Sequence, residues 1–127
     1  MDSRDPAESA IEPLVRTELS RILSSPEFEG ADRMSALLKY LVTTTIEGRS
    51  DHLKESVIGV QVFGREIGYD TKIDPVVRVS AGRLRQRLLK FYERTGEAPA
   101  VRIEIPKGSY VPEFAMVGQP PSDPAAA

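Results

Sequence analysis

Apolar side chains recur three and four residues apart in four segments of this chain, which is the spacing of one face of an α-helix. This periodicity predicts helices over residues 10–24, 31–47, 54–62 and 75–94. Ser9 and Glu12 have the spacing of a capping box at the start of the first helix. Asp74 and Pro75 are residue types preferred at the N-cap and in the first turn of the fourth. The sequence therefore predicts a largely helical protein.

A change of period marks residues 101–114. The first five of them alternate apolar and polar side chains, as a half-buried strand does. Pro106 and Gly108 supply turn geometry, and a second strand is expected from Tyr110 onward. Pro112 suits an edge strand, because it has no N–H to donate to a sheet ladder. This segment is therefore predicted to form a β-hairpin.

The predicted elements form one domain over residues 9–115. The ends, residues 1–8 and 116–127, are expected to be disordered because they offer little that a core could bury. The expected fold is mainly α with a C-terminal β-hairpin. Three helices followed by a hairpin is the order of a winged helix-turn-helix domain, to which the helix over 10–24 is an N-terminal addition. We expect that helix either to pack on its own domain or to form the seam of a homodimer.

The helix over 75–94 has two contrasting faces. One is apolar and is expected to be buried; it contains Val77, Ala81, Leu84, Leu88 and Phe91. The opposite face is mostly polar and basic, and contains Arg78, Val79, Gly82, Arg83, Gln86 and Lys90. A glycine inside a helix costs about 1 kcal/mol relative to alanine. Gly82 therefore indicates either a tolerated defect or, as we favour, a close approach of this helix to DNA.

Charge is distributed unevenly along the chain. The formal net charge is −2, yet residues 71–110 carry nine Lys and Arg against four Asp and Glu. Exposed charges more than about 10 Å away are largely screened at physiological salt, so a polyanion responds to the local field of the face that it approaches. The basic segment includes the outer face of the helix over 75–94, which favours a nucleic acid as the partner.

Three runs of residues resemble the OmpR/PhoB-type winged-helix effector domain, a bacterial DNA-binding family. They are Val62-Phe-Gly, then after a loop and Asp74 the run Arg83-Leu-Arg-Gln-Arg-Leu88, and finally Val101-Arg-Ile-Glu-Ile-Pro-Lys-Gly-Ser-Tyr-Val. The resemblance covers about residues 31–114 and extends to winged-helix domains at the head of larger bacterial signalling and repeat proteins. It implies a recognition helix over 75–94, which enters the major groove, and a wing over 101–114. The helix over 10–24 stands where that family has a four-stranded sheet.

The predicted DNA-binding residues come from this helix and from the wing. They are Arg78, Ser80, Gly82, Arg83, Arg85, Gln86, Arg87, Lys90, Lys107, Ser109 and Tyr110. The resemblance implies the contacts of Arg83, Arg85 and the three wing residues. The helical pattern independently favours Arg78, Arg83 and Gln86 as the residues that face the groove. Arginine can engage guanine O6 and N7 with two hydrogen bonds, so these residues are expected to read base edges.

The other predicted contacts are to the DNA backbone. Lys90 and Lys107 are expected to bind phosphates. Arg85 and Arg87 lie nearer the flanks of the helix, where either phosphate contact or pairing within the chain is expected. Ser80, near the start of the helix, is expected to donate to a phosphate or to a base edge.

The sequence thus predicts a sequence-specific, double-stranded DNA-binding transcriptional regulator, located in the cytoplasm at the nucleoid. The alternative is an adaptor that uses the same basic helix on an acidic protein partner. An enzyme is not expected, because His52 and its neighbours Ser50 and Asp51 cannot converge on a nucleophile from one loop. No cofactor, small-molecule ligand or metal is expected, since the chain has no Cys and a single His. No run of about 20 apolar residues predicts a membrane span.

Overall fold

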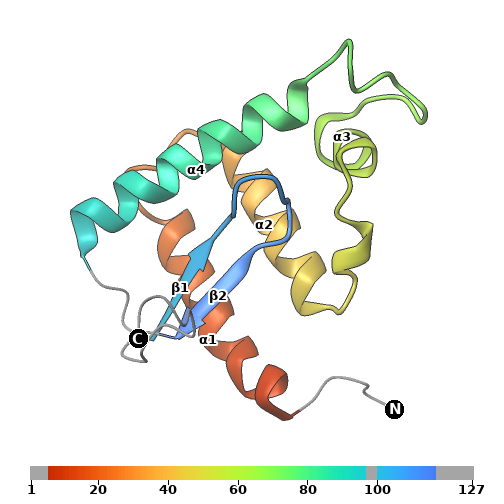
Figure 1. Cartoon of the computed structure of the whole chain (residues 1–127). Helices are drawn as coiled ribbons and strands as arrows, with labels where there is room; N and C mark the ends of the chain where they lie inside the picture. The colour runs from red at the N-terminus through yellow and green to blue at the C-terminus, as the bar shows by residue number, and fades with distance from the viewer. Residues whose placement is uncertain (1–5, 97–99, 117–127) are drawn as a thin grey trace, which may run out of the picture.

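The computed structural model describes residues 6–96 and 100–116, with side chains from residue 11 onward (Figure 1). This part of the chain is mainly helical and ends in a two-stranded antiparallel hairpin, which confirms the predicted class at that level. The elements are α1 (Pro6–Leu23), α2 (Asp32–Ile46), the 3₁₀ turn η1 (Ser50–His52), α3 (Glu55–Phe63), α4 (Val76–Thr95), β1 (Val101–Glu104) and β2 (Glu113–Met116). None of these helices combines the length and the apolar character that a membrane span requires.

The first helix begins earlier than predicted. α1 starts at Pro6, so residues 6–8 are helical rather than disordered, and Ser9 lies inside the helix instead of capping it. Proline is well suited to a first helical turn, where its missing N–H is not needed. Pro13 then falls in the interior and removes one backbone hydrogen bond. The helix continues past it because its following residues, among them Val15, are buried in the core.

The boundaries of α2, α3 and α4 agree with the prediction to within one residue. α3 ends at Gly64, which has a φ of 67° in the left-handed region that glycine adopts most easily. The predicted N-cap of α4 is corrected by one residue, because Pro75 occupies that position. Asp74 instead accepts a hydrogen bond from the N–H of Val76 at 3.3 Å and binds Arg65 at 2.6 Å, and the bond from Arg65 lowers the pKa of this carboxyl.

One apolar core joins the four helices and the hairpin. Its fully buried side chains include Val15 and Ile22 of α1, Leu37, Leu38 and Leu41 of α2, Ile58 of α3, Val77 and Leu84 of α4, and Val101 and Ile103 of β1. All five positions predicted for the apolar face of α4 are buried. Because Ile22 has no exposed surface, the apolar face of α1 packs within the chain. A homodimer seam on α1 stays a prediction, and it would have to use outward side chains such as Leu14, which is 36 % exposed.

The hairpin is shorter than predicted on its second side. β1 pairs with β2 in the register Val101↔Met116, Arg102↔Ala115, Ile103↔Phe114 and Glu104↔Glu113. The second strand therefore begins at Glu113 and not at Tyr110, directly after Pro112, which has no N–H to offer a ladder. We call residues 105–112 the hairpin loop. Within it, Gly108 has a φ of 80°, a conformation that favours glycine. The predicted disordered tail covers residues 116–127. Its first residue, Met116, belongs to β2, and residues 117–127 lie outside the described residues.

Candidate nucleic-acid interface

The outer side of α4 carries a row of polar side chains, Arg83, Gln86 and Lys90, which we call the α4 ridge. Spacings of three and four residues place them on one side of the helix, and Arg83 and Lys90 lie about 10 Å apart along its axis. All three are exposed. Their side chains make no hydrogen bond or ion pair with any residue that the structure describes. These three predicted site residues are therefore free to meet a partner.

Gly82 lies beside the α4 ridge, and the position that a side chain would take there is open. Apart from its chain neighbours and the backbone of its own helix, a Cβ built on Gly82 would have no heavy atom of the described residues within 4 Å. Packing inside the protein therefore gives no reason for a glycine here. Val79, one turn before Arg83, is an exposed apolar side chain on the same outer side. The surface of α4 is thus low at Gly82 and open to close approach from outside.

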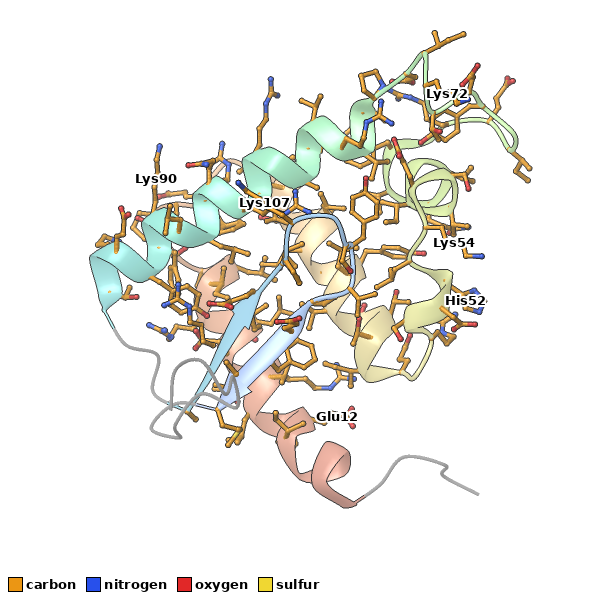
Figure 2. The ribbon with its side chains drawn as sticks, viewed as in Figure 1. Glu12, His52, Lys54, Lys72, Lys90 and Lys107 are labelled. Carbon is orange, nitrogen blue, oxygen red and sulfur yellow. The ribbon has the colours of Figure 1, made fainter. Side chains whose placement is uncertain are left out.

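The hairpin loop lies alongside α4 and adds one more free cation. Lys107 is exposed, and its ammonium has no partner among the described residues. It lines one groove together with Gln86 of the α4 ridge. Gln86 also lines a second groove with Lys90, and Figure 2 shows that Lys90 and Lys107 extend from two different elements, α4 and the hairpin loop. The predicted wing and the predicted recognition helix are neighbours in space.

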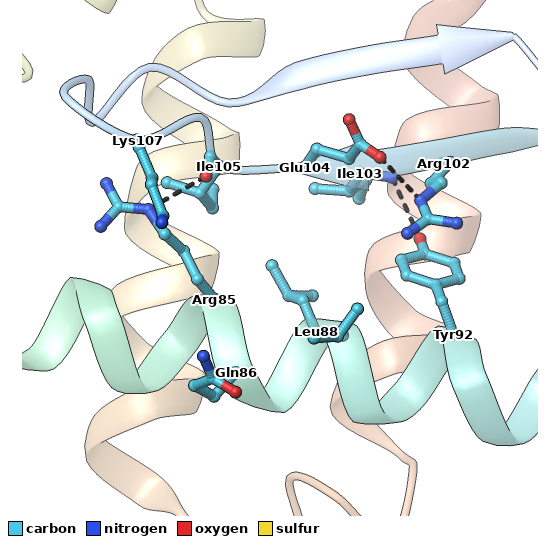
Figure 3. A pocket seen from close by; sticks show the side chains of 10 residues that line it. Arg85, Gln86, Leu88, Tyr92, Arg102, Ile103, Glu104, Ile105 and Lys107 are labelled. Atoms are coloured by element: carbon cyan, nitrogen blue, oxygen red, sulfur yellow. Dashed lines mark hydrogen bonds and ion pairs between the residues drawn. The ribbon is translucent and has the colours of Figure 1, made fainter.

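Arg85 holds the hairpin loop against α4. Its Nε donates to the carbonyl of Ile105 at 3.0 Å (Figure 3). Its Nη2 donates to the carbonyls of Pro106 and Ser109, each at 3.0 Å. This guanidinium is half-buried and uses three of its five N–H donors within the chain, so the phosphate contact of Arg85 stays a prediction for its remaining donors. Of the two roles open to a flanking arginine, the structure shows pairing within the chain.

Tyr92 makes a second link between α4 and β1. Its hydroxyl donates to Glu18 Oε2 at 2.6 Å and accepts the N–H of Ile103 at 3.0 Å. Glu18 is buried and also binds Arg21 at 2.8 and 2.9 Å. Burial, and then the hydrogen bond to Glu18, raise the pKa of Tyr92 well above its usual value. Arg85 and Tyr92 thus contact the backbone of β1 and its extension at two points, both visible in Figure 3.

On its other flank, α4 is tied to the segment between α1 and α2. Arg87 donates to the backbone carbonyl of Glu27 at 2.6 Å. Arg94 binds the carboxylate of the same residue at 2.8 Å, and this bond lowers the pKa of Glu27 while it raises that of Arg94. Arg87 is half-buried and pairs within the chain through Nη1, and its expected phosphate contact stays a prediction. Two flanking arginines therefore fix the angle of α4 on the domain.

The N-terminal end of α4 is less available than expected. Arg78 is half-exposed and directs Nη1 to both carboxylate oxygens of Glu55 on α3, at 3.1 and 3.3 Å. Ser80 is only 7 % exposed and lies on the inner side of the helix, so it is not part of the outer surface. Its place follows from the helical period, because Ser80 adjoins Val77, Ala81 and Leu84 on the buried face.

The last two predicted wing residues, Ser109 and Tyr110, are half-buried. Ser109 accepts the bond from Arg85 through its carbonyl, and its Oγ accepts the N–H of Val111 at 3.1 Å. Tyr110 is half-buried and packs against the core. Burial, and then the nearby carboxylate of Glu55, raise the pKa of Tyr110. Both residues belong to the base of the hairpin loop, whereas Lys107 belongs to its exposed side.

The hydrogen bonds of Arg85 and Arg87 do not neutralise the positive charge of these side chains. Arg85 and Arg87 donate to neutral carbonyls and pair with no carboxylate of the described residues. Together with the α4 ridge and Lys107, they give this side of the domain five cations without a carboxylate partner there: Arg83, Arg85, Arg87, Lys90 and Lys107. Glu93, exposed one turn beyond Lys90, ends the positive stretch toward the C-terminus of α4. The surface has the electrostatic character that a phosphate backbone requires.

Other candidate chemistry does not assemble in the described part of the chain. His52 lies exposed in η1, with the Asp51 carboxylate 4.0 Å away. The described residues contain no group of three or more His, Cys, Asp or Glu side chains that could hold a metal ion. No family model, curated protein or solved structure matches this chain. The likeness to OmpR/PhoB-type domains therefore rests on the sequence motifs alone.

Proposed function

We propose that this chain is a winged helix-turn-helix protein that binds double-stranded DNA as a sequence-specific transcription regulator. The order α2, α3, α4 and hairpin supports this fold, with α3 and α4 as the helix-turn-helix pair and the hairpin as the wing. In this arrangement α4 enters the major groove, which is about 12 Å wide and admits one helix. The hairpin loop then lies over the neighbouring backbone.

The observation that carries the proposal is the α4 ridge itself. It presents Arg83, Gln86 and Lys90 side by side, exposed and without partners in the described chain. The arginines that flank it, Arg85 and Arg87, hold the helix in place through hydrogen bonds to backbone carbonyls. A helix prepared for a groove needs both features, because its free side chains must be presented on a rigid support. An exposed face that served only for solubility would not need its flanks fixed by partly buried hydrogen bonds.

The free residues divide into two roles. Arg83 can donate to guanine O6 and N7, and Gln86 can pair with adenine, so both are assigned to base edges. Lys90 and Lys107 are point charges at either side of this pair and are assigned to phosphates, which position the protein without reading sequence. Arg85 and Arg87 add positive charge to this surface and hold α4 in position through their bonds to backbone carbonyls. Arg78 stays with Glu55 at the end of the helix.

The test begins by selecting bound fragments from a pool of genomic DNA. The selected fragment and a random fragment are then titrated with the wild type, Arg83→Ala and Arg49→Ala. Arg49 is an exposed arginine far from α4 in the sequence, paired with Glu47, so it controls for the loss of one charge. We expect Arg83→Ala to lose about 1–3 kcal/mol on the selected fragment and to lose specificity. Arg49→Ala should bind as the wild type does.

Two results would overturn the proposal. The base-reading role fails if Arg83→Ala prefers the selected fragment as strongly as the wild type does. DNA binding as a whole fails if the wild type shows no salt-dependent binding to any fragment between about 50 and 200 mM salt, where phosphate contacts change affinity most steeply. The basic surface would then belong to an acidic protein partner.

A further inference from the structure

A small pocket lies between the N-terminal half of α4 and the hairpin loop. Its volume is about 240 Å³, and it is lined by Arg78, Arg85, Gly108, Ser109 and Tyr110. Pockets for drug-sized ligands span about 300–1,000 Å³. This one is smaller, so it suits a single compact group and not a whole nucleotide. The function proposed above uses the free ridge beside it and assigns nothing to the pocket.

The polar atoms left unused around this pocket are donors. Arg85 uses Nε and Nη2 on the three carbonyls of the loop, which leaves Nη1 without a partner among the described residues. Arg78 uses only Nη1 on Glu55, which leaves Nε and Nη2. The carbonyl of Ser109, an acceptor that could have faced a ligand, is already occupied by Arg85. The lining therefore favours a ligand that is rich in acceptors.

Two hydroxyls add to these donors. Ser109 Oγ accepts the N–H of Val111, so its own O–H remains to be donated. The Tyr110 hydroxyl makes no hydrogen bond with the described residues, and the raised pKa of Tyr110 keeps it protonated at neutral pH. Gly108 leaves open space beside the backbone, since a Cβ there would meet no described atom within 4 Å. An anion can thus approach the main chain closely.

The pocket is positively charged, because two of its lining residues are arginines and none is acidic. Glu55 balances Arg78 and is not among the lining residues, whereas Arg85 bonds only to neutral carbonyls. We propose that this pocket binds one phosphate group, held by the spare guanidinium donors of Arg78 and Arg85 and by the hydroxyls of Ser109 and Tyr110. The proposal deepens the proposed function and rests on it for the source of the phosphate, which is the DNA backbone between α4 and the hairpin loop. Free inorganic phosphate offers the same chemistry.

Two variants test the pocket with little change to its packing. Tyr110→Phe and Ser109→Ala each remove one hydroxyl, and Tyr40→Phe is the matched control because Tyr40 is a half-buried tyrosine of α2 whose hydroxyl has no hydrogen bond in the described chain. In the first arm, the DNA-free protein is labelled with ¹⁵N and titrated with potassium phosphate, then with potassium chloride at equal ionic strength. We expect phosphate alone to shift the amide signals of residues 108–110, and the shifts to be lost in Tyr110→Phe. The melting temperature of each variant verifies that it is folded.

In the second arm, the same proteins are titrated with the selected and the random DNA fragments. A hydrogen bond to a charged group is worth at least about tenfold in binding, so we expect Tyr110→Phe to lose about tenfold on both fragments. The dependence on salt should stay as in the wild type, because no charge is removed. Tyr40→Phe should match the wild type throughout. Ser109→Ala repeats the test if Tyr110→Phe does not fold.

The two arms separate the sources of the phosphate and the two proposals. Loss on DNA without amide shifts in the first arm assigns the pocket to a backbone phosphate, and amide shifts without loss on DNA assign it to free phosphate. If neither occurs while the wild type binds DNA, the pocket proposal is wrong and the proposed function stands. If the wild type binds no DNA, the proposed function fails, and the phosphate titration alone decides the pocket.

Discussion

The guanidinium of Arg85 donates from Nη2 to the backbone carbonyl of Ser109 at 3.0 Å, which links the middle of α4 to the far side of the hairpin loop. The same side chain holds Ile105 and Pro106, so one residue of the helix fixes both ends of the turn. The acceptors are all backbone carbonyls. The position of the loop therefore depends on the identity of residue 85 more than on the side chains of the loop itself.

Replacing Arg85 by lysine should destabilise the protein although the charge is kept. A single ammonium cannot reproduce the planar fork that serves three carbonyls. We expect Arg85→Lys to lower the free energy of unfolding by about 1–3 kcal/mol in urea denaturation. Arg83→Lys, on the same helix but without a partner in the described chain, should change it by less than about 0.5 kcal/mol. Equal stability of the two variants would show that the three bonds do not hold the loop.

Removing the free lysines should change how DNA binding depends on salt. Each phosphate contact contributes about 0.9 to the slope of log K against log salt. We expect Lys90→Gln and Lys107→Gln each to reduce that slope by about one on both selected and random DNA. Lys39→Gln, an exposed lysine of α2, is the control and should leave the slope unchanged. A slope that stays the same in Lys107→Gln would remove the hairpin loop from the interface.

Gly82→Ala should separate stability from binding. The added methyl group meets no described atom within 4 Å, and alanine is favoured over glycine in a helix by up to about 1 kcal/mol. We therefore expect the variant to unfold at higher urea concentration and at the same time to bind DNA more weakly, because in the proposed complex the methyl group would stand between α4 and the major groove. Unchanged affinity in a stabilised Gly82→Ala would identify the glycine as a tolerated defect.

Tyr92→Phe should destabilise the fold in a way that depends on pH. The variant leaves the N–H of Ile103 without its acceptor and removes one bond from buried Glu18, which should cost about 1–3 kcal/mol at pH 7. The pKa of Tyr92 is raised in the folded state, so its contribution is complete below the unfolded value of about 10 and declines as the pH rises above it. The difference between wild type and variant in urea denaturation should therefore narrow between pH 7 and pH 11. A difference that stays constant over this range would contradict the assignment.

The buried face of α4 could be predicted from spacing alone. Val77, Leu84 and Phe91 follow the helical period, and a core accepts any apolar side chain on that face. The exposed positions of Arg83 and Gln86 follow from the same period, because these residues lie on the side of the helix opposite its buried face. A single sequence therefore predicts which face of α4 is buried, because burial selects apolar residue types at helical spacing.

The roles of Arg85 and Arg87 could not be predicted in the same way. Their acceptors are main-chain carbonyls 20 to 60 residues away, and a carbonyl is present at every residue, so no residue type indicates it. The one available signal was the position of both arginines on the flanks of the helix, beside the buried face. Ser80 is a different case, because the helical period places it beside Val77, Ala81 and Leu84 on the buried face, and the predicted DNA contact did not follow that period.

The links from α4 also determine what the hairpin can pair with. The N–H of Ile103 and the carbonyl of Ile105 are satisfied by Tyr92 and Arg85, so the side of β1 that faces away from β2 has these groups already occupied by its own helix. An exposed strand edge is a template for pairing with a second chain, and two-stranded ribbons are especially open to it. On that side the ribbon is protected from intermolecular sheet growth, which disfavours association of two copies of the chain through their hairpins.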